Sequence, residues 1–325
     1  MRLRLVPEKT EWDFFRRERL WLGISAVLIV LAFGSFLIQG LNYGIDFSGG
    51  TTIRLESSED IDVGAYRDAL NGLELGDVTI TEVFDPSFAG QSVASITIQA
   101  QEGAEAVTGE TITLVGEALQ AVDPGLQLPF SSVESVGPTV SGELIQTSVL
   151  AVLLAVGAVL VYIWMRFEWQ FALGAVAALV HDVILTIGVF SELQIRFDLP
   201  IIAALLTIVG YSLNDTVVVF DRVRENLRRF KKTDLKDVLN ISINETLSRT
   251  FMTSVTTLLA LLALFFLGGD VIRGFVFAMI WGVIVGTYSS IFVASAILLV
   301  LGVKRDWSKP SEGGGAGTRF GNVDA

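Results

Sequence analysis

The residues that could do chemistry in this chain are ionisable side chains inside a stretch that is otherwise apolar enough to cross a bilayer. Residues 199–220 form this stretch, which contains Asn214 and Asp215 and ends beside Asp221. An ionised aspartate at the centre of a spanning helix costs about 2.5–3.5 kcal/mol even on lenient scales, so it must face a partner, a polar cavity or a proton path. We therefore predict that this helix carries the mechanism.

A helix over this stretch places its polar residues on one side. At a rise of 1.5 Å per residue, Asp215 lies about 9 Å from Asp221, which falls at the membrane surface. We expect Asp215 to be in that half of the membrane, where a proton can reach it through a modest cavity. At 3.6 residues per turn, the polar face comprises Tyr211, Asn214, Asp215, Val218, Asp221 and Arg222.

A second polar face begins at the same side of the membrane, on the next apolar stretch. It opens with Arg249 and continues with Thr253, Thr256 and Thr257, which are four, seven and eight residues further on. Because Arg249 falls at the same side, we predict that it can pair with Asp215.

The third apolar stretch contributes His181 and Asp182 near its midpoint. His181 is the single histidine of the chain, and it could accept a hydrogen bond, relay a proton or be satisfied by a neighbour. An acid at mid-membrane is costlier than a neutral imidazole, so the interpretation of Asp182 favours function.

Composition predicts a polytopic α-helical membrane protein. The chain has 325 residues, 51% of them hydrophobic, and a mean hydropathy of +0.59. The last apolar stretch is over-long, which indicates tilt or an interfacial turn, and the first is interpreted as a retained anchor because it lacks a convincing cleavage site. Six stretches are long enough to span a bilayer: 21–39, 144–164, 170–190, 199–220, 250–268 and 272–301.

Charge predicts the orientation. The N-terminal segment 1–20 holds six Lys or Arg residues, whereas the loop 40–142 holds only Arg54 and Arg67. The positive-inside rule therefore places both termini in the cytoplasm of a multi-pass protein of the inner (plasma) membrane, with a basic cytoplasmic segment at 221–249 within the helical region 143–304. This segment could touch anionic lipid or a partner, but retention of positive charge inside already explains it.

The loop 40–142 is predicted to be an acidic extracytoplasmic (periplasmic) domain with a ferredoxin-like α+β fold. The pattern gives strands at 51–55, 78–84, 93–100 and 128–136 and helices at 63–73 and 104–121, in the order βαββαβ. Its negative charge argues against nucleic acid as a partner. With no His and no Cys, and with scattered acids, a binding or mechanical role is favoured over catalysis, and no metal site is expected.

Both junctions between this domain and the spans contain glycine, which permits unusual backbone angles, and the second also contains proline, which restricts them. Asp46, Phe47, Ser48, Gly49 and Gly50 precede it, and the second junction consists of Val136, Gly137 and Pro138. They are interpreted as matched hinges, with ordinary turn chemistry as the alternative. In the last span small residues recur every four positions, which favours close helix packing: Gly274, Ala278, Gly282, Gly286, Ser290 and Ala294.

These motifs resemble one family over nearly the whole chain. The chain resembles SecF, the smaller membrane subunit of the bacterial SecD-SecF protein-export complex, in the resistance-nodulation-division superfamily. The resemblance rests on the stretches 46–50 and 136–138, on His181-Asp182, on 210–222 with the sequence GYSLNDTVVVFDR, and on 247–250 with the sequence LSRT.

The resemblance implies a half-bundle of six spanning helices that pairs with a SecD-like subunit and uses the proton gradient, with no other cofactor, to help exported unfolded polypeptide through the Sec translocation channel. It implies that Asp215 carries the proton and that Arg249 is its basic partner. The candidate supporting polar residues are Asn214, Asp182, His181, Tyr211 and Thr253. The glycine-rich tail 305–325 has no counterpart and is expected to be disordered. An efflux-pump subunit and a non-transporting tethering factor are the alternatives, and a hydrolase is disfavoured because no HExxH or GxSxG string occurs.

Overall fold

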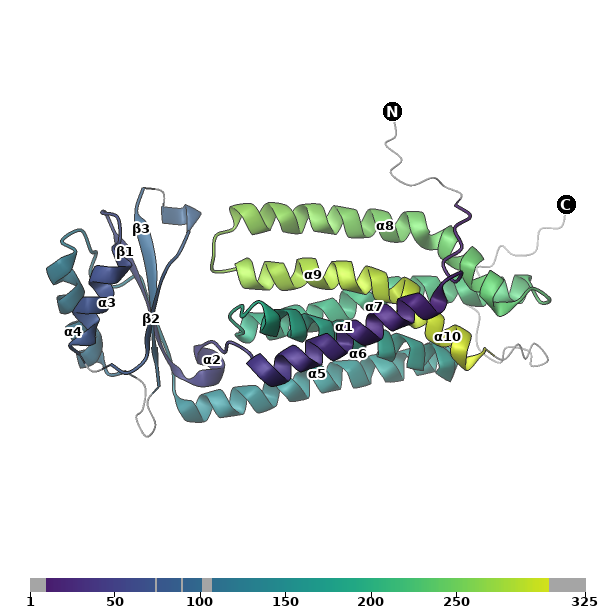
Figure 1. Cartoon of the computed structure of the whole chain (residues 1–325), viewed down its shortest axis with the longest axis horizontal. Helices are drawn as coiled ribbons and strands as arrows, with labels where there is room; N and C mark the ends of the chain where they lie inside the picture. Colours follow the sequence, from purple (N-terminus) through teal and green to yellow (C-terminus); the bar gives the residue numbers. More distant parts are fainter. Residues whose placement is uncertain (1–9, 74, 89, 101–106, 304–325) are drawn as a thin grey trace, which may run out of the picture.

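The structure is a computed structural model that describes residues 10–73, 75–88, 90–100 and 107–303. A bundle of long helices carries a small α+β domain at one end (Figure 1). We call the end of the bundle beside this domain the domain end, and the opposite end the far end. The predicted tail 305–325 and most of the first half of the segment 1–20 lie outside the described residues.

Among the described residues, six long helical stretches form the bundle, and each is long and apolar enough to cross a membrane. The predicted class of polytopic helical membrane protein is confirmed. The last stretch contains a π-helical turn, η2, and the tilt or interfacial turn expected from its length stays a prediction. The stretches are α1 (Glu18–Gln39), α5 (Pro138–Arg166), α6 (Trp169–Glu192), α7 (Leu199–Arg229), α8 (Leu235–Leu267) and α9 (Arg273–Ser289), the last continuing through η2 (Ser290–Ala294) into α10 (Ser295–Leu301).

The centre of the bundle is formed by α6, α7 and α9. In the most apolar part of each of these helices 61%, 44% and 61% of the residues are buried, whereas in α1, α5 and α8 the share is 11% or less. The small-residue ridge of α9 packs on α7, as its spacing predicts. A Cβ on Gly282 would overlap the side chain of Ile208, and one on Gly286 would lie 3.0 Å from Ser212 Cβ. Small residues are therefore what allows these two helices to approach.

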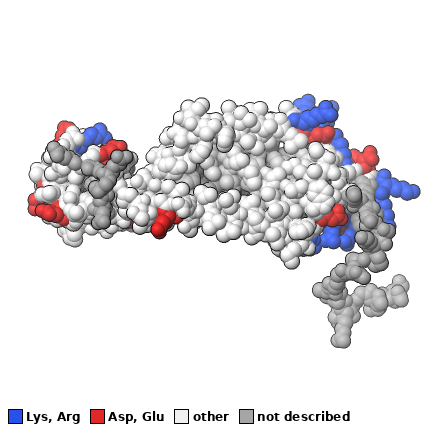
Figure 2. All heavy atoms as spheres, turned by 90° about the horizontal axis from the view of Figure 1, so that it is seen from below, with Lys and Arg blue, Asp and Glu red and all other residues white. Residues whose placement is uncertain are grey.

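The basic segment 221–249 is mostly helical, because α7 and α8 extend well beyond the stretches that hydropathy predicts. On the face shown in Figure 2, Lys and Arg gather at the far end of the bundle. Acidic side chains lie on the α+β domain, at the far end and in a small patch near the junction, and the bundle between is largely free of charge. This uncharged part of the bundle surface is the part that a bilayer would cover.

The α+β domain has the predicted element order. A short 3₁₀ turn, η1 (Pro86–Phe88), precedes the third strand. The strands form one antiparallel sheet in the order β2-β3-β1-β4, and both helices lie on the side of the sheet away from the bundle (Figure 1). In chain order the elements are β1 (Gly50–Ser57), α3 (Val63–Asn71), β2 (Val78–Glu82), β3 (Ser92–Gln99), α4 (Gly109–Val122) and β4 (Ser132–Val136).

Alternation along β1 and β3 sends every second side chain toward these helices, where Ile53, Leu55 and Ile96 are fully buried. The Asp62 side chain begins α3 by accepting hydrogen bonds from the Gly64 and Ala65 amides at 2.8 and 3.1 Å.

The two junctions lie side by side and are tightly packed. The first contains a single helical turn, α2 (Ile45–Ser48), followed by Gly49 and Gly50 with φ of +75° and +137°, values that favour glycine. A Cβ on Gly50 would also overlap a carbonyl of β3, and one on Gly49 would lie 3.5 Å from Pro138 Cα at the start of α5. Gly50 pairs with Val136 across the sheet, and Gly137 precedes the first turn of α5. The glycines therefore serve close packing, and their role as hinges stays a prediction.

Candidate functional site

Asp215 is buried in the bundle, with only 4% of its surface exposed. It lies on α7 and faces α8, where the Thr250 hydroxyl donates a long hydrogen bond to its Oδ1 at 3.5 Å. The other oxygen, Oδ2, is buried and has no hydrogen-bond partner among the described residues. An apolar interior gives such an atom no compensation for lost hydration, so this carboxyl is a natural place for a proton to bind.

No direct ion pair joins Asp215 to Arg249 among the described residues, and Arg249 is exposed. The charge of Arg249 is nevertheless near enough to act on the Asp215 carboxyl, and their pairing stays a prediction. Thr250, the neighbour of Arg249, points inward and makes the direct contact. Consecutive residues on a helix are about 100° apart, so Thr250 and Arg249 fall on opposite sides of the boundary between the packed and the open face of α8.

The same geometry divides the predicted polar face of α7. Asp215 is buried whereas Asn214 is exposed, and Asp221 lies at the far end with half of its side chain exposed. The wide predicted stripe therefore spans both a packed side and an open side of α7.

The remaining supporting residues lie along the contact between α7 and α8. The Tyr211 hydroxyl donates to Thr257 Oγ1 at 3.4 Å. Thr253 instead donates to the Thr250 carbonyl oxygen within its own helix at 2.9 Å. Tyr211 therefore joins the two helices, and the hydroxyl of Thr253 does not reach Asp215.

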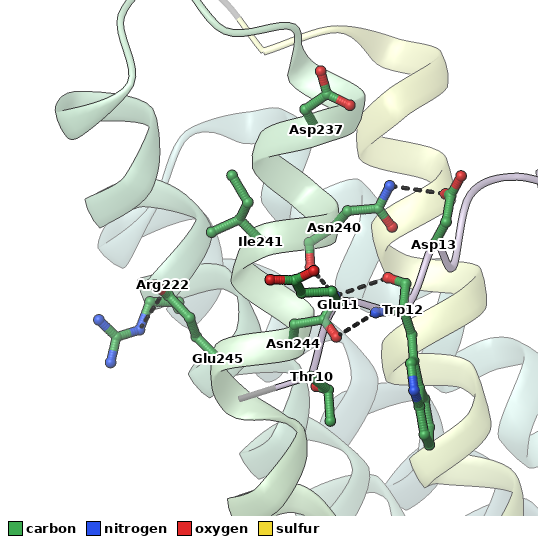
Figure 3. A pocket seen from close by; sticks show the side chains of 10 residues that line it. All are labelled: Thr10, Glu11, Trp12, Asp13, Arg222, Asp237, Asn240, Ile241, Asn244 and Glu245. Atoms are coloured by element: carbon green, nitrogen blue, oxygen red, sulfur yellow. Dashed lines mark hydrogen bonds and ion pairs between the residues drawn. The ribbon is translucent and has the colours of Figure 1, made fainter. Parts of the chain in front are cut away.

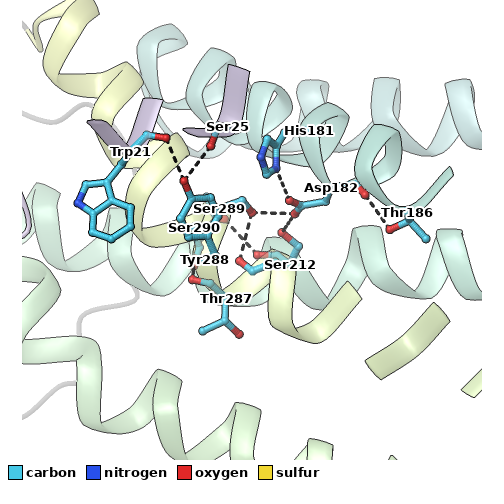
Figure 4. Close-up of polar contacts among 12 residues, drawn as sticks. Trp21, Ser25, His181, Asp182, Thr186, Ser212, Thr287, Tyr288, Ser289 and Ser290 are labelled. Carbon is cyan, nitrogen blue, oxygen red and sulfur yellow. Dashed lines mark hydrogen bonds and ion pairs between the residues drawn. The ribbon is translucent and has the colours of Figure 1, made fainter. Parts of the chain in front are cut away.

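A second buried acid, Asp182, joins three helices near the middle of the bundle (Figure 4). Its Oδ2 accepts hydrogen bonds from Ser212 of α7 at 2.6 Å and from Ser289 of α9 at 2.8 Å, and its Oδ1 lies 2.9 Å from His181 Nδ1. Sequence reasoning identified His181 and Asp182 but missed both serines. Ser212 lies one helical turn before Asp215, so the spacing on α7 could have indicated it, whereas no local pattern marks Ser289.

At the domain end, Asp46 joins the first junction to the helix that carries Asp215. Its Oδ2 accepts a hydrogen bond from the Leu199 amide, the first residue of α7, at 2.9 Å. The Gly44 amide donates to the Phe197 carbonyl at 2.8 Å, and the Phe47 and Phe197 rings lie with centroids 6.0 Å apart. Asp46 and Phe47 are thus parts of a firm attachment to α7.

Asp198, beside this attachment, has a perturbed pKa. Burial raises the pKa of its carboxyl above the ordinary value, the charge of Asp46 raises it further, and the nearby Arg196 guanidinium opposes both effects. A carboxyl with a raised pKa at this end of α7 makes the attachment sensitive to the pH of the compartment it faces.

A second attachment joins the α+β domain to the loop between α8 and α9. The Phe84 amide donates to Asp270 Oδ2 at 2.6 Å, and the Asp270 amide donates to the Phe84 carbonyl at 2.9 Å. Asp270 also forms a close ion pair with Arg273 at the start of α9. The domain is therefore fastened at the domain ends of both α7 and α8, the two helices that meet at Asp215.

At the far end, the segment before α1 lies against α8 and lines an open cavity of about 820 Å³ (Figure 3). Asn244 holds this segment through two hydrogen bonds, accepting from the Trp12 amide at 2.9 Å and donating to the Trp12 carbonyl at 2.8 Å. Asn240 accepts from the Phe14 amide at 2.9 Å. The cavity lining is rich in acids and includes Arg222, which pairs with Glu245 at 3.6 Å.

The fold and the site define a multi-pass helical membrane protein with a buried acid on a spanning helix. Residues 115–304 match the family "Protein export membrane protein SecD/SecF, C-terminal", and residues 34–61 match the "SecD/SecF GG Motif". The chain is 58% identical over 325 residues to the protein translocase subunit SecF of Cereibacter sphaeroides, covering 100% of this chain and 99% of the relative. It is 59% identical over 315 residues to that of Rhodobacter capsulatus, covering 95% and 94%. The chain therefore belongs to the SecF family of protein translocase subunits, and it is a multi-pass protein of the inner membrane.

Two solved structures share its fold. A SecDF structure from Thermus thermophilus, described as a translocon-associated membrane protein, matches with a TM-score of 0.79 and 37% identity over 93% of this chain. A second SecDF structure, in a super-membrane-facing form, matches with a TM-score of 0.68 and 38% identity over 92% of this chain. This chain spans 40% of the length of each of those chains.

Proposed function

We propose that this chain is one half of a proton-driven export machine, which with a SecD-like subunit helps unfolded polypeptides to leave through the Sec translocation channel. Its basic far end lies in the cytoplasm with both termini, and its ferredoxin-like α+β domain lies outside the membrane, where exported chain emerges. The observation that carries the proposal is Asp215, a buried carboxyl in a spanning helix whose Oδ2 has no partner among the described residues.

Protonation of Asp215 changes the contact between α7 and α8. As a carboxylate, Asp215 accepts the Thr250 hydroxyl of α8 and carries a charge that a low-dielectric interior disfavours. As an acid it is neutral and gains a hydrogen to donate. Each form favours its own spacing of α7 against α8, so binding and release of a proton select between two arrangements of these helices.

The same two helices hold the α+β domain, which gives the proton a route to mechanical work. About 24 Å of α7 separates Asp215 from Leu199, where Asp46 attaches the domain. The domain end of α8 leads into Asp270, which binds Phe84. A shift of α7 against α8 therefore displaces one attachment of the domain relative to the other, and the domain tilts.

The SecD-like partner is supported by polar groups that this chain leaves uncovered. Asn214 and Arg249 are exposed on α7 and α8 beside the apolar surface of the bundle, where lipid would not satisfy them. The solved SecDF chains are also longer, since this chain spans 40% of each. A second half-bundle covers these side chains in our proposal, and the positive charge of Arg249 then lies at the contact of the two halves as the basic partner of Asp215.

The energy available fits a switch of this kind. One charge that crosses a potential of 100 mV releases about 2.3 kcal/mol. That free energy changes an equilibrium between two arrangements roughly 50-fold, because about 1.4 kcal/mol corresponds to a factor of ten. Two arrangements of similar stability can thus be driven by a single proton.

The test is proton-gradient-dependent completion of export in inverted membrane vesicles that contain the assembled complex. Asp215→Asn and Arg249→Met are compared with the unaltered chain at matched levels. Asp221→Asn is the control, because it makes the same chemical change on the same helix at a half-exposed site that pairs with Arg166. We expect the gradient-dependent part of export to be lost in the first two variants and retained in the control.

Two results would count against this function. Normal gradient-dependent export by Asp215→Asn would leave the acid a structural residue and favour a tethering factor. Recovery of the chain in a complex of its own kind, without a SecD-like subunit or a translocation channel, would favour an efflux pump. Co-purification from membranes at native expression levels distinguishes this second case.

A further inference from the structure

Asp182 and His181 form a buried charged cluster that the proposed role of Asp215 does not use. Their side chains are 1% and 2% exposed. The cluster joins α6 to α7 through Ser212 and to α9 through Ser289, at the centre of the bundle (Figure 4). Structural packing alone does not require an acid there, because apolar side chains of similar volume hold helices together at least as well.

The contacts of Asp182 are ones that a carboxylate can accept. Its Oδ2 accepts hydrogen bonds from two hydroxyls, from Ser212 at 2.6 Å and Ser289 at 2.8 Å, and its Oδ1 lies 2.9 Å from His181 Nδ1. A carboxylate offers about four lone-pair sites and no donor, which matches three incoming donors. The short distances to the hydroxyls are those of charge-assisted hydrogen bonds.

A buried carboxylate needs a balancing charge, and His181 is the group that can supply it. No lysine or arginine bonds to Asp182 in the described part of the chain, and the titratable neighbours are Asp215 one turn further along α7 and Tyr288 of α9, whose ring centroid lies 6.1 Å from that of His181. On the other helices packed against α6, titratable residues lie at or near the ends: Glu18 and Arg19 on α1, and Glu143, Tyr162 and Arg166 on α5, with none on α10.

The free nitrogen of His181 marks where the proton enters and leaves. Nδ1 is held by Asp182, whereas Nε2 is buried with no hydrogen-bond partner among the described residues. Loss of the Nε2 proton would leave Nδ1–H still bonded to the carboxylate, so one proton can be exchanged without breaking the contacts of Asp182. Ser212 places this exchange one helical turn from Asp215, on the same side of α7.

We propose that His181 and Asp182 are a second proton-binding site of the bundle, in which the carboxylate held by Ser212 and Ser289 stabilises the imidazolium form of His181. The purpose of the site rests on the proposed proton-driven function, since a proton held there sets the charge beside Asp215 and across the contacts between α6, α7 and α9. Its existence does not depend on export.

The single histidine makes the site directly observable. The full chain is labelled with isotopic histidine, purified through a tag that contains no histidine, and placed in vesicles of phosphatidylethanolamine and phosphatidylglycerol. Nitrogen NMR then reports which ring nitrogens carry a proton, from about pH 5 to about pH 10. We expect both nitrogens to be protonated at neutral pH and only Nδ1 to remain protonated at the alkaline end.

Three variants locate the cause. Asp182→Asn should remove the second proton of His181 at neutral pH, and Ser212→Ala, a milder change, should shift the spectrum in the same direction with the fold retained. Thr186→Val is the matched control, because Thr186 is equally buried on α6 but donates to the backbone oxygen of Asp182. It should leave the imidazole signals unchanged.

A neutral imidazole at neutral pH in the unaltered chain would overturn the second site, and so would two protons retained through about pH 10, which would make the pair a fixed ion pair. Unchanged His181 signals in Asp182→Asn would overturn it as well. These outcomes are separate from export: loss of export in Asp215→Asn with a neutral His181 would leave the proposed function standing and remove only this site.

Discussion

The hydrogen bond from the Leu199 amide to Asp46 joins the junction of the α+β domain directly to the helix of Asp215, so its removal tests the proposed coupling. Four backbone amides at a helix start lack partners within the helix. In α7 the second of these positions is Pro200, which has no amide hydrogen, and the Asp198 side chain does not cap the helix. Asp46 alone therefore serves the Leu199 amide, at 2.9 Å.

Two substitutions separate the acceptor from the charge. Asp46→Asn keeps an oxygen acceptor and loses the charge near the positive helix terminus, which is worth about 0.3–1 kcal/mol. Asp46→Ala also loses the cap, worth about 1 kcal/mol. We expect a total near 1.5 kcal/mol for alanine, which corresponds to about tenfold faster hydrogen exchange at the Leu199 amide. Gradient-dependent export should fall in the same order, with the complex still assembled.

Asp62→Ala provides the matched control, because Asp62 also caps a helix through its carboxylate but lies within the α+β domain, on α3. It should loosen α3 and leave exchange at Leu199 unchanged. If Asp46→Ala speeds exchange at Leu199 tenfold while export stays normal, the domain is not driven through this contact and the coupling argument fails.

Three further changes have defined outcomes. Since burial raises the pKa of Asp198, its contribution to the stability of the attachment is greatest at low pH and is lost as pH rises through that pKa, so Asp198→Asn should remove this part of the pH dependence of hydrogen exchange at the Gly44 amide. Tyr66→Phe removes the buried hydroxyl that donates to Asp123 and should speed exchange of the strand amides by an amount equivalent to about 1–3 kcal/mol. Gly188→Ala places a Cβ 2.7 Å from Ala32 Cα. It should lower the free energy of unfolding by about 1–3 kcal/mol, because α1 must move away from α6.

For each of these three predictions one result would contradict the reasoning. Asp198→Asn with an unchanged pH profile would show that another group titrates at the attachment. The Tyr66 argument fails if strand exchange in Tyr66→Phe equals that of the unaltered chain near neutral pH, where the phenol is protonated. Gly210→Ala is the control for Gly188→Ala, since no heavy atom lies within 4 Å of a Cβ at that position, and equal losses in both would indicate helix propensity rather than crowding.

The fold was largely predictable because its signals are local. Apolar length sets the six spans, and alternation along β3 sets the strand that pairs with β1. The burial of Asp215 inside the bundle was also predictable. Its neighbours in sequence are apolar, and an acid exposed to lipid would be costly.

The contacts of the site were not predictable, because they join residues far apart in the chain. Leu199 meets Asp46 across 153 positions, and Ser289 meets Asp182 across 107. Helix periodicity gives the direction of a side chain only to within the width of a face. It therefore placed Asn214 with Asp215, although the boundary of the packed surface falls between them.

Under the proposed function, the strengths of the two attachments predict how the α+β domain would move. The contact of Phe84 with Asp270 consists of two hydrogen bonds, one to a carboxylate, which together are worth about 2–4 kcal/mol. One proton driven by 100 mV supplies about 2.3 kcal/mol, which is comparable. The attachment at Asp46 is larger, since it adds the hydrogen bond from the Gly44 amide to the Phe197 carbonyl and the packing of Phe47 on Phe197. If the proposed proton-driven function holds, a single proton is enough to open the contact at Asp270 while the one at Asp46 holds, and the domain should pivot about α2 and the domain end of α7.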